Sequence, residues 1–159
     1  MQKVNIGIVG TGWCGGIRAE TCAASPYVSE LHIAEIKEAR LKEVAEKTKP
    51  ATATTDYRQL LASDKINAII VSATPETVHY PMAKETLLAG KHLLLEKPIS
   101  LTLAEADELI ALATGLQDAR PGQTVVIVVG SSSHATHRVV GSVTVSLARH
   151  SPVPLIIVP

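Results

Sequence analysis

The sequence contains no phenylalanine, and its 159 residues include only one tryptophan and three tyrosines. This shortage excludes a core built on aromatic side chains. Because 46% of the residues are nevertheless hydrophobic, the core must consist of Val, Ile, Leu and Ala. Such an aliphatic core is typical of parallel strands with helices on both faces, and the length suits one domain.

The chain also lacks an excess of charge of either sign. Fifteen basic residues balance fifteen acidic ones, and no long run of like charges occurs. We therefore expect neither a nucleic acid nor an acidic membrane surface as a partner. No apolar run approaches the length of a membrane span. Met1 leads into a predicted strand after two residues, so we expect no signal peptide.

Cysteine is scarce as well, because only Cys14 and Cys22 are present. They lie too far apart along one predicted helix and its lead-in to form a disulfide. We therefore expect two reduced thiols and a cytoplasmic protein. No metal site is predicted, because His134 and His137 have no carboxylate near them in the sequence and a third ligand is not apparent.

Predicted strands and helices alternate along the first 115 residues. The apolar runs predict strands over 4–9, 31–35, 51–53, 67–71 and 92–95. Helices are predicted over 13–24, 39–47 and 102–115, with a short helix ending at residue 61 and another ending before Gly90. Thr102 and Glu105 form a capping box, and Gly115 is the expected end of that helix.

This alternation predicts a doubly wound parallel α/β sheet in three αβα layers. The ligand crevice is expected at the carboxyl ends of the first and fourth strands, where the strand order reverses. Residues 116–123 are rich in turn formers and predict a connection, followed by a strand over 124–130, a helix near 135–149 and a strand over 155–158. Together they predict one domain over 1–159 with a sheet of about seven strands.

The first strand runs into a loop with the G-x-G-x-x-G spacing of dinucleotide-binding proteins. Gly10 allows a sharp turn, Gly12 leaves room for a pyrophosphate, and Gly15 lets the next helix pack closely. The helix would direct its free N–H groups at the phosphates. Glycine-rich turns of this kind also occur for packing reasons. The candidate cofactor-binding residues are Gly10, Thr11, Gly12, Trp13, Cys14 and Gly15.

Glu35 ends the second predicted strand, twenty residues after Gly15. A carboxylate at this position binds the adenosine ribose hydroxyls of NAD and repels the 2′-phosphate of NADP. NAD is therefore favoured over NADP, although Lys37 and Arg40 are close enough to affect the choice. In the alternative interpretation, Glu35 is only a polar strand end.

Residues 3–115 resemble the N-terminal NAD(P)-binding domain of the Gfo/Idh/MocA oxidoreductase family, which includes glucose–fructose oxidoreductase and inositol dehydrogenase. The resemblance rests on the glycine loop, Glu35, Ala73-Thr74-Pro75 with His79, the segment 89–92 and Glu96-Lys97-Pro98. It implies a Rossmann-like fold. It also implies that Ala73, Thr74, Pro75 and His79 lie beside the pyrophosphate and ribose.

The same resemblance implies that Glu96 and Lys97 lie at the nicotinamide end, with Lys97 near the substrate. A lysine there can polarise a substrate hydroxyl or carbonyl during hydride transfer. In the alternative interpretation, Lys97-Pro98 is an ordinary turn. Nothing in the sequence matches the substrate domain of this family. We therefore expect Lys97 to be a vestigial catalytic residue and the chain to bind a cofactor without efficient turnover.

Residues 124–158 resemble the C-terminal part of a universal stress protein. The resemblance implies a possible nucleotide or anion site, with Gly130, Ser131, Ser132, Gly141 and Ser142 as candidates. Ser133 replaces a glycine of that family, and the half that holds adenine is absent, which argues against ATP. Binding of a phosphate or sulfate ion remains an alternative, because hydroxyls and helix N–H groups bind such anions.

Two resemblances in one chain predict a chimera joined at 116–123, and an engineered chimera is favoured over a natural fusion. Three hypotheses follow for its function. The chain binds NAD as a small-molecule dinucleotide, or it is a purely structural chimera without a ligand, or it binds ATP or an anion through its second part. Exposed apolar surface predicts a homodimer.

Overall fold

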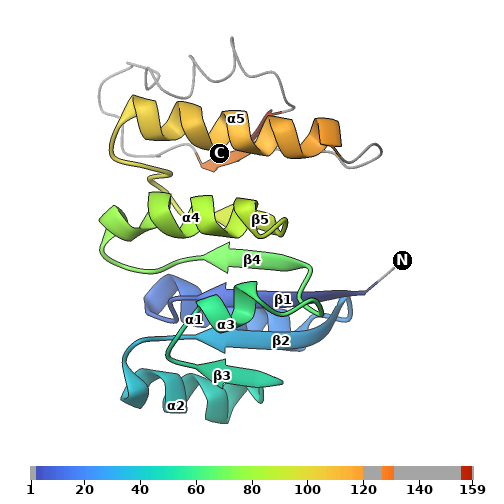
Figure 1. The fold of residues 1–159 in the computed structure, drawn as a ribbon. Coiled ribbons are helices and arrows are strands. Elements are labelled where there is room, and N and C mark those ends of the chain that lie inside the picture. The colour runs from blue at the N-terminus through green and yellow to red at the C-terminus, as the bar shows by residue number, and fades with distance from the viewer. Residues whose placement is uncertain (1–2, 120–126, 131–154, 159) are drawn as a thin grey trace. The chain divides into compact units, whose positions relative to one another are not determined.

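The computed structural model describes residues 3–119, 127–130 and 155–158 (Figure 1). The chain divides into two compact units, Met1–Ala106 and Asp107–Pro159. The boundary falls inside helix α5, Leu103–Ala119. The prediction of one domain with a join at 116–123 stays a prediction, and most of that join lies outside the described residues.

The first unit contains a parallel sheet of five strands in the order β3-β2-β1-β4-β5. The strands are β1 (Val4–Val9), β2 (Val28–Ala34), β3 (Thr52–Thr54), β4 (Ala68–Val71) and β5 (His92–Leu95). They alternate with α1 (Trp13–Ala24), α2 (Glu38–Thr48), α3 (Arg58–Leu61), the 3-10 helix η1 (Glu76–Val78) and α4 (His79–Leu88). The strand order reverses between β1 and β4, as predicted, and the doubly wound α/β fold is confirmed.

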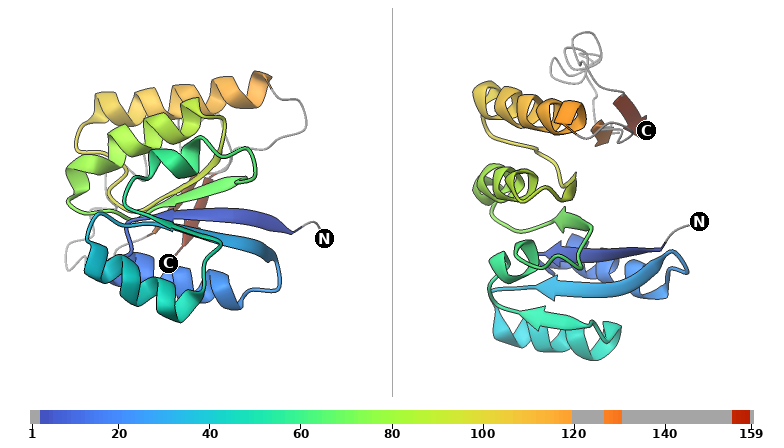
Figure 2. Two further views of the ribbon diagram at one scale, coloured as in Figure 1. Left: turned by 60° about the horizontal axis from the view of Figure 1, so that its bottom comes forward. Right: turned by 45° about the vertical axis from the view of Figure 1, so that its right-hand side comes forward.

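Helices cover both faces of the sheet (Figure 2), and each face carries its own aliphatic core. On the face of α1 and α2, six residues form one cluster: Ile8, Ala19, Leu31, Ile33, Val44 and Ile70. On the face of α3 and α4, six others form the second: Val9, Ala34, Leu60, Ile66, Ile69 and Val71. Successive strand residues such as Ile8 and Val9 supply opposite faces, because side chains alternate along a strand. Burial on both faces explains why these strands are near-continuous apolar runs.

Local signals set several element ends as expected. Thr102 N–H donates to Glu105 Oε2 over 3.2 Å, and Glu105 N–H donates to Thr102 Oγ1 over 3.3 Å, so the capping box is confirmed. The helix predicted to end before Gly90 is confirmed, because α4 ends at Leu88 and Gly90 takes the left-handed conformation with a φ of 69°. The predicted end of the helix over 102–115 at Gly115 is wrong, because α5 continues to Ala119. A glycine inside a helix costs only about 1 kcal/mol relative to alanine, and Leu116 and Gln117 favour helix.

In the second unit, β6 (Ile127–Gly130) and β7 (Leu155–Val158) pair in parallel, with Ile127 opposite Leu155. Both strands were predicted, and they form a two-stranded sheet of their own. The extension to seven strands therefore stays a prediction. The predicted helix near 135–149 and the candidates Ser131, Ser132, Gly141 and Ser142 lie outside the described residues. Gly130 is the last residue of β6.

None of the described helices is long and apolar enough to cross a membrane. Cys14 and Cys22, both within the described part of the chain, are free thiols. Burial raises the pKa of Cys22, although Arg18 opposes this shift. A raised pKa keeps a thiol protonated and makes it a poorer nucleophile.

His32 makes the stability of the first unit depend on pH. Its side chain is buried in β2, and its Nε2 lies 3.4 Å from Glu30 Oε2. Burial lowers the pKa of His32 below its ordinary value of 6.5, and Glu30 only partly opposes this. The unfolded chain then takes up the proton first as the pH falls. The protonation of His32 therefore leaves the free energy of unfolding unchanged above the ordinary pKa. It lowers the free energy of unfolding as the pH falls from the ordinary pKa to the pKa of the folded state.

We expect the free energy of unfolding of the native chain to fall more between about pH 7.5 and 5.5 than that of His32→Gln. Urea denaturation at each pH measures the difference. The exposed His92 provides the control, and His92→Gln should follow the native chain. An equal decrease in the native chain and His32→Gln would contradict the expectation.

Candidate functional site

A cleft of about 410 Å³ opens at the carboxyl ends of the central strands. Its walls come from the loop after β1, the segment after β2, Thr55 and Tyr57, and the segment after β4 with η1 and α4. This is the place at which the reversal of strand order predicts a crevice. Six of the predicted site residues line it: Gly10, Gly12, Glu35, Ala73, Thr74 and Pro75.

The three glycines of the loop have different surroundings. Gly10 has a φ of 82°, and a Cβ there would collide with the backbone of Ala73. A Cβ on Gly15 would collide with the carbonyl oxygen of Gly10. A Cβ on Gly12, in contrast, would meet no described atom within 4 Å. Gly10 and Gly15 are thus required by the packing of the protein itself, whereas the space beside Gly12 is open to a ligand.

Helix α1 begins directly beyond this open space. Gly12 is its N-cap residue, and among the described residues no side chain caps the helix. Gly12 O accepts the N–H of Gly16, which is the first bond of the helix. The N–H groups of the first turn have no carbonyl partner within a helix. Together with the helix dipole, they favour an anionic ligand at this end.

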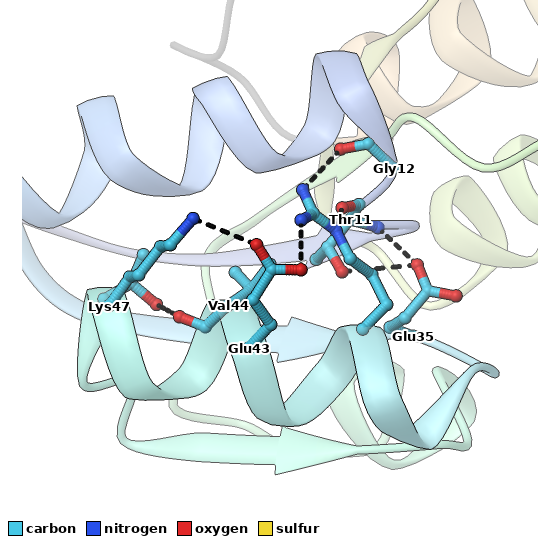
Figure 3. Close-up of polar contacts among 8 residues, drawn as sticks. Thr11, Gly12, Glu35, Glu43, Val44 and Lys47 are labelled. Carbon is cyan, nitrogen blue, oxygen red and sulfur yellow. Dashed lines mark hydrogen bonds and ion pairs between the residues drawn. The ribbon is translucent and has the colours of Figure 1, made fainter.

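The carboxylate of Glu35 is held at the β2 side of the cleft (Figure 3). Its Oε2 accepts the N–H of Thr11 over 2.7 Å and the Thr11 hydroxyl over 3.2 Å. Its Oε1 accepts the N–H of Lys37 over 3.1 Å. The side chain is thereby fixed, while the residue keeps 9% of its surface exposed. A carboxylate accepts about four hydrogen bonds, so capacity remains for a hydroxyl of a ligand.

Arg40 supports the loop from α2. Its Nε donates to Thr11 O over 2.7 Å and its Nη2 to Gly12 O over 3.2 Å. Its Nη1 donates to Glu43 over 2.7 Å, and Glu43 also accepts from Lys47. These two donors hold the pKa of the Glu43 carboxyl below its ordinary value. The guanidinium of Arg40 is therefore directed at the loop backbone and at Glu43.

Several predicted site residues are not part of the cleft lining. Thr11 is fully buried behind the loop, Cys14 is partly buried, and Trp13 is 82% exposed. His79 is buried, and its ring nitrogens contact the carbonyl oxygens of Ala73 and Pro98 at 2.8 and 2.7 Å. The ring therefore binds the backbone of the segments that follow β4 and β5.

Glu96 and Lys97 follow β5, at the same edge of the sheet. Glu96 forms an ion pair with Arg18 of α1, and its Oε1 accepts the N–H of Lys97 over 3.1 Å. The Lys97–Pro98 peptide bond is cis, as is Thr74–Pro75. Neither Glu96 nor Lys97 is among the described residues that line the cleft.

The cleft also has an apolar wall, which the sequence does not reveal. It is formed by Ile36, Tyr57, Val78 and Met82. Ile36 is 75% exposed, which is unusual for a large apolar side chain beside a buried strand end. Burial, and then the hydrogen bond to Glu85, raises the pKa of Tyr57 to about 12, so this side chain stays a neutral donor. The wall can take a flat apolar group next to Glu35.

Residues 4–120 match the Gfo/Idh/MocA family, described as an oxidoreductase family with an NAD-binding Rossmann fold. The match covers more than half of the chain. The chain belongs to the Gfo/Idh/MocA family. The resemblance inferred from the glycine loop and the Glu-Lys-Pro segment is thus confirmed for this part of the sequence, and the match ends inside the predicted join.

Individual relatives support the assignment. An uncharacterized oxidoreductase of Bacillus subtilis, YrbE, is 34% identical over 110 residues, covering 69% of this chain and 32% of the relative. The structure of GenD2 from gentamicin A biosynthesis, in complex with NAD, is 30% identical with a TM-score of 0.68, covering 73% of this chain and 33% of GenD2.

A second solved structure holds the other dinucleotide. KijD10, a 3-ketoreductase from Actinomadura kijaniata in complex with NADP, is 28% identical with a TM-score of 0.64, covering 72% of this chain and 36% of KijD10. The chain therefore spans about a third of the length of the relatives that it matches. Membership of the Gfo/Idh/MocA family does not by itself decide between NAD and NADP.

The different surroundings of the glycines predict different effects of alanine. Gly10→Ala should lower the free energy of unfolding by about 1–3 kcal/mol, because the left-handed backbone and the contact with Ala73 both oppose a Cβ. Gly12→Ala should change it by about 0.5 kcal/mol or less. Urea denaturation of the two variants measures both values. A large loss in Gly12→Ala would contradict the assignment of its open space to a ligand.

Proposed function

We propose that residues 4–120 bind NAD in the cleft, with the pyrophosphate over Gly12 and the adenosine ribose at Glu35. The observation that carries the proposal is the open space at Gly12, between two glycines that the protein packs tightly and beside an uncapped helix N-terminus. The apolar wall with Ile36 and Tyr57 suits the adenine ring, which is flat and lies next to that ribose. In this arrangement the nicotinamide half extends toward the segments after β4 and β5.

NAD is proposed over NADP because of the charges at the β2 end. The fixed carboxylate of Glu35 would repel a 2′-phosphate, and its remaining acceptor capacity suits ribose hydroxyls. Arg40 could neutralise such a phosphate, but three of its five N–H donors are engaged with Thr11 O, Gly12 O and Glu43. GenD2 was solved with NAD and KijD10 with NADP, so similar chains bind either dinucleotide. We therefore base the choice of NAD on the charged side chains near the ribose.

We propose that this chain by itself binds the cofactor without efficient turnover. Hydride transfer also needs a substrate wall and positioned acid–base groups. Lys97 is the candidate for polarising a substrate oxygen, and among the described residues we find no second candidate beside it. Residues 124–158 would then be a foreign part of a chimera. The family match ends at residue 120, before this part begins.

Isothermal calorimetry tests the binding proposal. NADH should bind saturably to the native chain and at least about tenfold more tightly than NADPH. Gly12→Val should abolish binding, because its side chain fills the space of the pyrophosphate while meeting open space in the protein. Glu35→Gln should reduce the preference for NADH about tenfold, because the charge that repels the 2′-phosphate is gone.

Circular dichroism and urea denaturation provide the control, since Gly12→Val should unfold like the native chain. Absence of NADH binding in the native chain would refute the proposal and leave the purely structural chimera. Binding of ATP that Gly12→Val does not affect would instead support a site in the second part of the chain. Light scattering tests the proposed homodimer, which a clean monomer would contradict.

A further inference from the structure

Lys97 lies in a segment whose two flanking residues are each held by a different helix. On one side, Glu96 forms its ion pair with Arg18 of α1, and its N–H donates to Val71 O over 2.9 Å. On the other side, the carbonyl oxygen of Pro98 contacts Nδ1 of His79, at the start of α4, at 2.7 Å. The backbone of Lys97 is thus fixed between two anchored neighbours.

His79 is placed to couple this segment to the wall of the cleft. Its Nε2 contacts Ala73 O at 2.8 Å, and Ala73 both lines the cleft and packs against Gly10. The ring is 2% exposed, and both of its contacts are to backbone carbonyl oxygens. A carbonyl oxygen only accepts a hydrogen bond and a neutral imidazole carries one N–H, so the tautomer determines which of the two contacts is the hydrogen bond. The tautomer with the proton on Nδ1 is the one that donates to Pro98 O.

From this geometry we propose that His79 is a positioning residue that links the 96–98 segment, and with it Lys97, to Ala73 in the wall of the cofactor cleft. The inference rests on the proposed NAD binding for its functional consequence. The strand order places the adenosine half at β2 and the nicotinamide half beyond β4. His79 would therefore affect the nicotinamide half of the ligand while leaving the adenosine half unchanged. The resemblance implies that His79 lies beside the pyrophosphate and ribose, and that expectation stays a prediction.

Two conservative substitutions separate the two contacts of the ring. Asparagine places its amide nitrogen near the position of Nδ1, so His79→Asn keeps a donor for Pro98 O. Glutamine reaches the position of Nε2, so His79→Gln keeps a donor for Ala73 O and loses the contact with Pro98. The proposal requires the first variant to keep the position of Lys97 and the second to lose it.

Amide hydrogen exchange of the ligand-free full chain tests the positioning directly. The N–H groups of Glu96 and Lys97 should exchange at least about tenfold faster in His79→Gln than in the native chain, and close to the native rate in His79→Asn. Those of the glycine loop should not change in either variant. Unchanged exchange at residues 96 and 97 in His79→Gln would overturn the proposal, whether or not the chain binds NAD.

Calorimetry with NADH and ADP-ribose tests the functional consequence. The native chain should bind NADH more tightly than ADP-ribose, which lacks the nicotinamide. His79→Gln should lower the affinity for NADH about tenfold, toward that for ADP-ribose, and leave the affinity for ADP-ribose unchanged. His79→Asn should keep the native affinity for both ligands. An equal loss for both ligands would indicate a merely structural role and overturn the proposal. If neither ligand binds the native chain, the proposed function fails, and the exchange experiment decides on His79 alone.

Arg18→Gln provides an independent variant in case His79→Gln does not fold. It releases Glu96 from the other side, through a partly exposed side chain, and should also reduce the preference for NADH over ADP-ribose. His92→Gln is the matched control at the opposite end of β5 and should preserve both affinities. The proposed anchoring would be overturned if Arg18→Gln preferred NADH over ADP-ribose as strongly as the native chain and the N–H of Glu96 exchanged at the native rate.

Discussion

The hydrogen bond from the N–H of Thr11 to the carboxylate of Glu35 joins the loop after β1 to the end of β2 over 2.7 Å. On the other side of the same residue, Arg40 binds Thr11 O over 2.7 Å. A negative and a positive side chain thus hold the two polar groups of one buried peptide segment. The positions of Gly12 and of the start of α1 depend on this arrangement, because both follow Thr11 directly.

This arrangement gives Glu35 and Arg40 two functions each. Glu35 fixes the loop and also presents its remaining acceptor capacity to the cleft. Arg40 supports two loop carbonyls and at the same time has few donors left for a phosphate on the ribose. Under the proposed function, selectivity between the two dinucleotides and the shape of the loop would therefore rest on the same few side chains.

The sequence predicts the sheet well because its strands are buried on both faces and appear as apolar runs, as in 67–71 and 92–95. The glycine loop and Glu35 could be found because their residues are close together in the sequence. Tyr57 and Met82 could not, since they reach the cleft from separate segments that only the folded chain brings together. The continuation of α5 past Gly115 was missed because a glycine weakens a helix without ending it.

His79 shows a different limit of prediction. Its position in a motif beside Thr74 and Pro75 places it near the cleft, but motif position does not reveal where a side chain points. In the structure the ring is directed at two carbonyl oxygens of the backbone. A polar residue within a binding motif can therefore be engaged with the backbone of its own chain.

The two-sided hold on Thr11 also has a thermodynamic consequence. A loop that is already fixed by its own protein does not have to be ordered by an incoming ligand, and ordering a flexible segment costs free energy at the moment of binding. Here the hydrogen bonds of Glu35 and Arg40 order the loop when the chain folds, before any ligand binds. The cleft is thus preorganised at the glycine loop, so the affinity of a dinucleotide bound there would reflect its contacts rather than the closing of a loop.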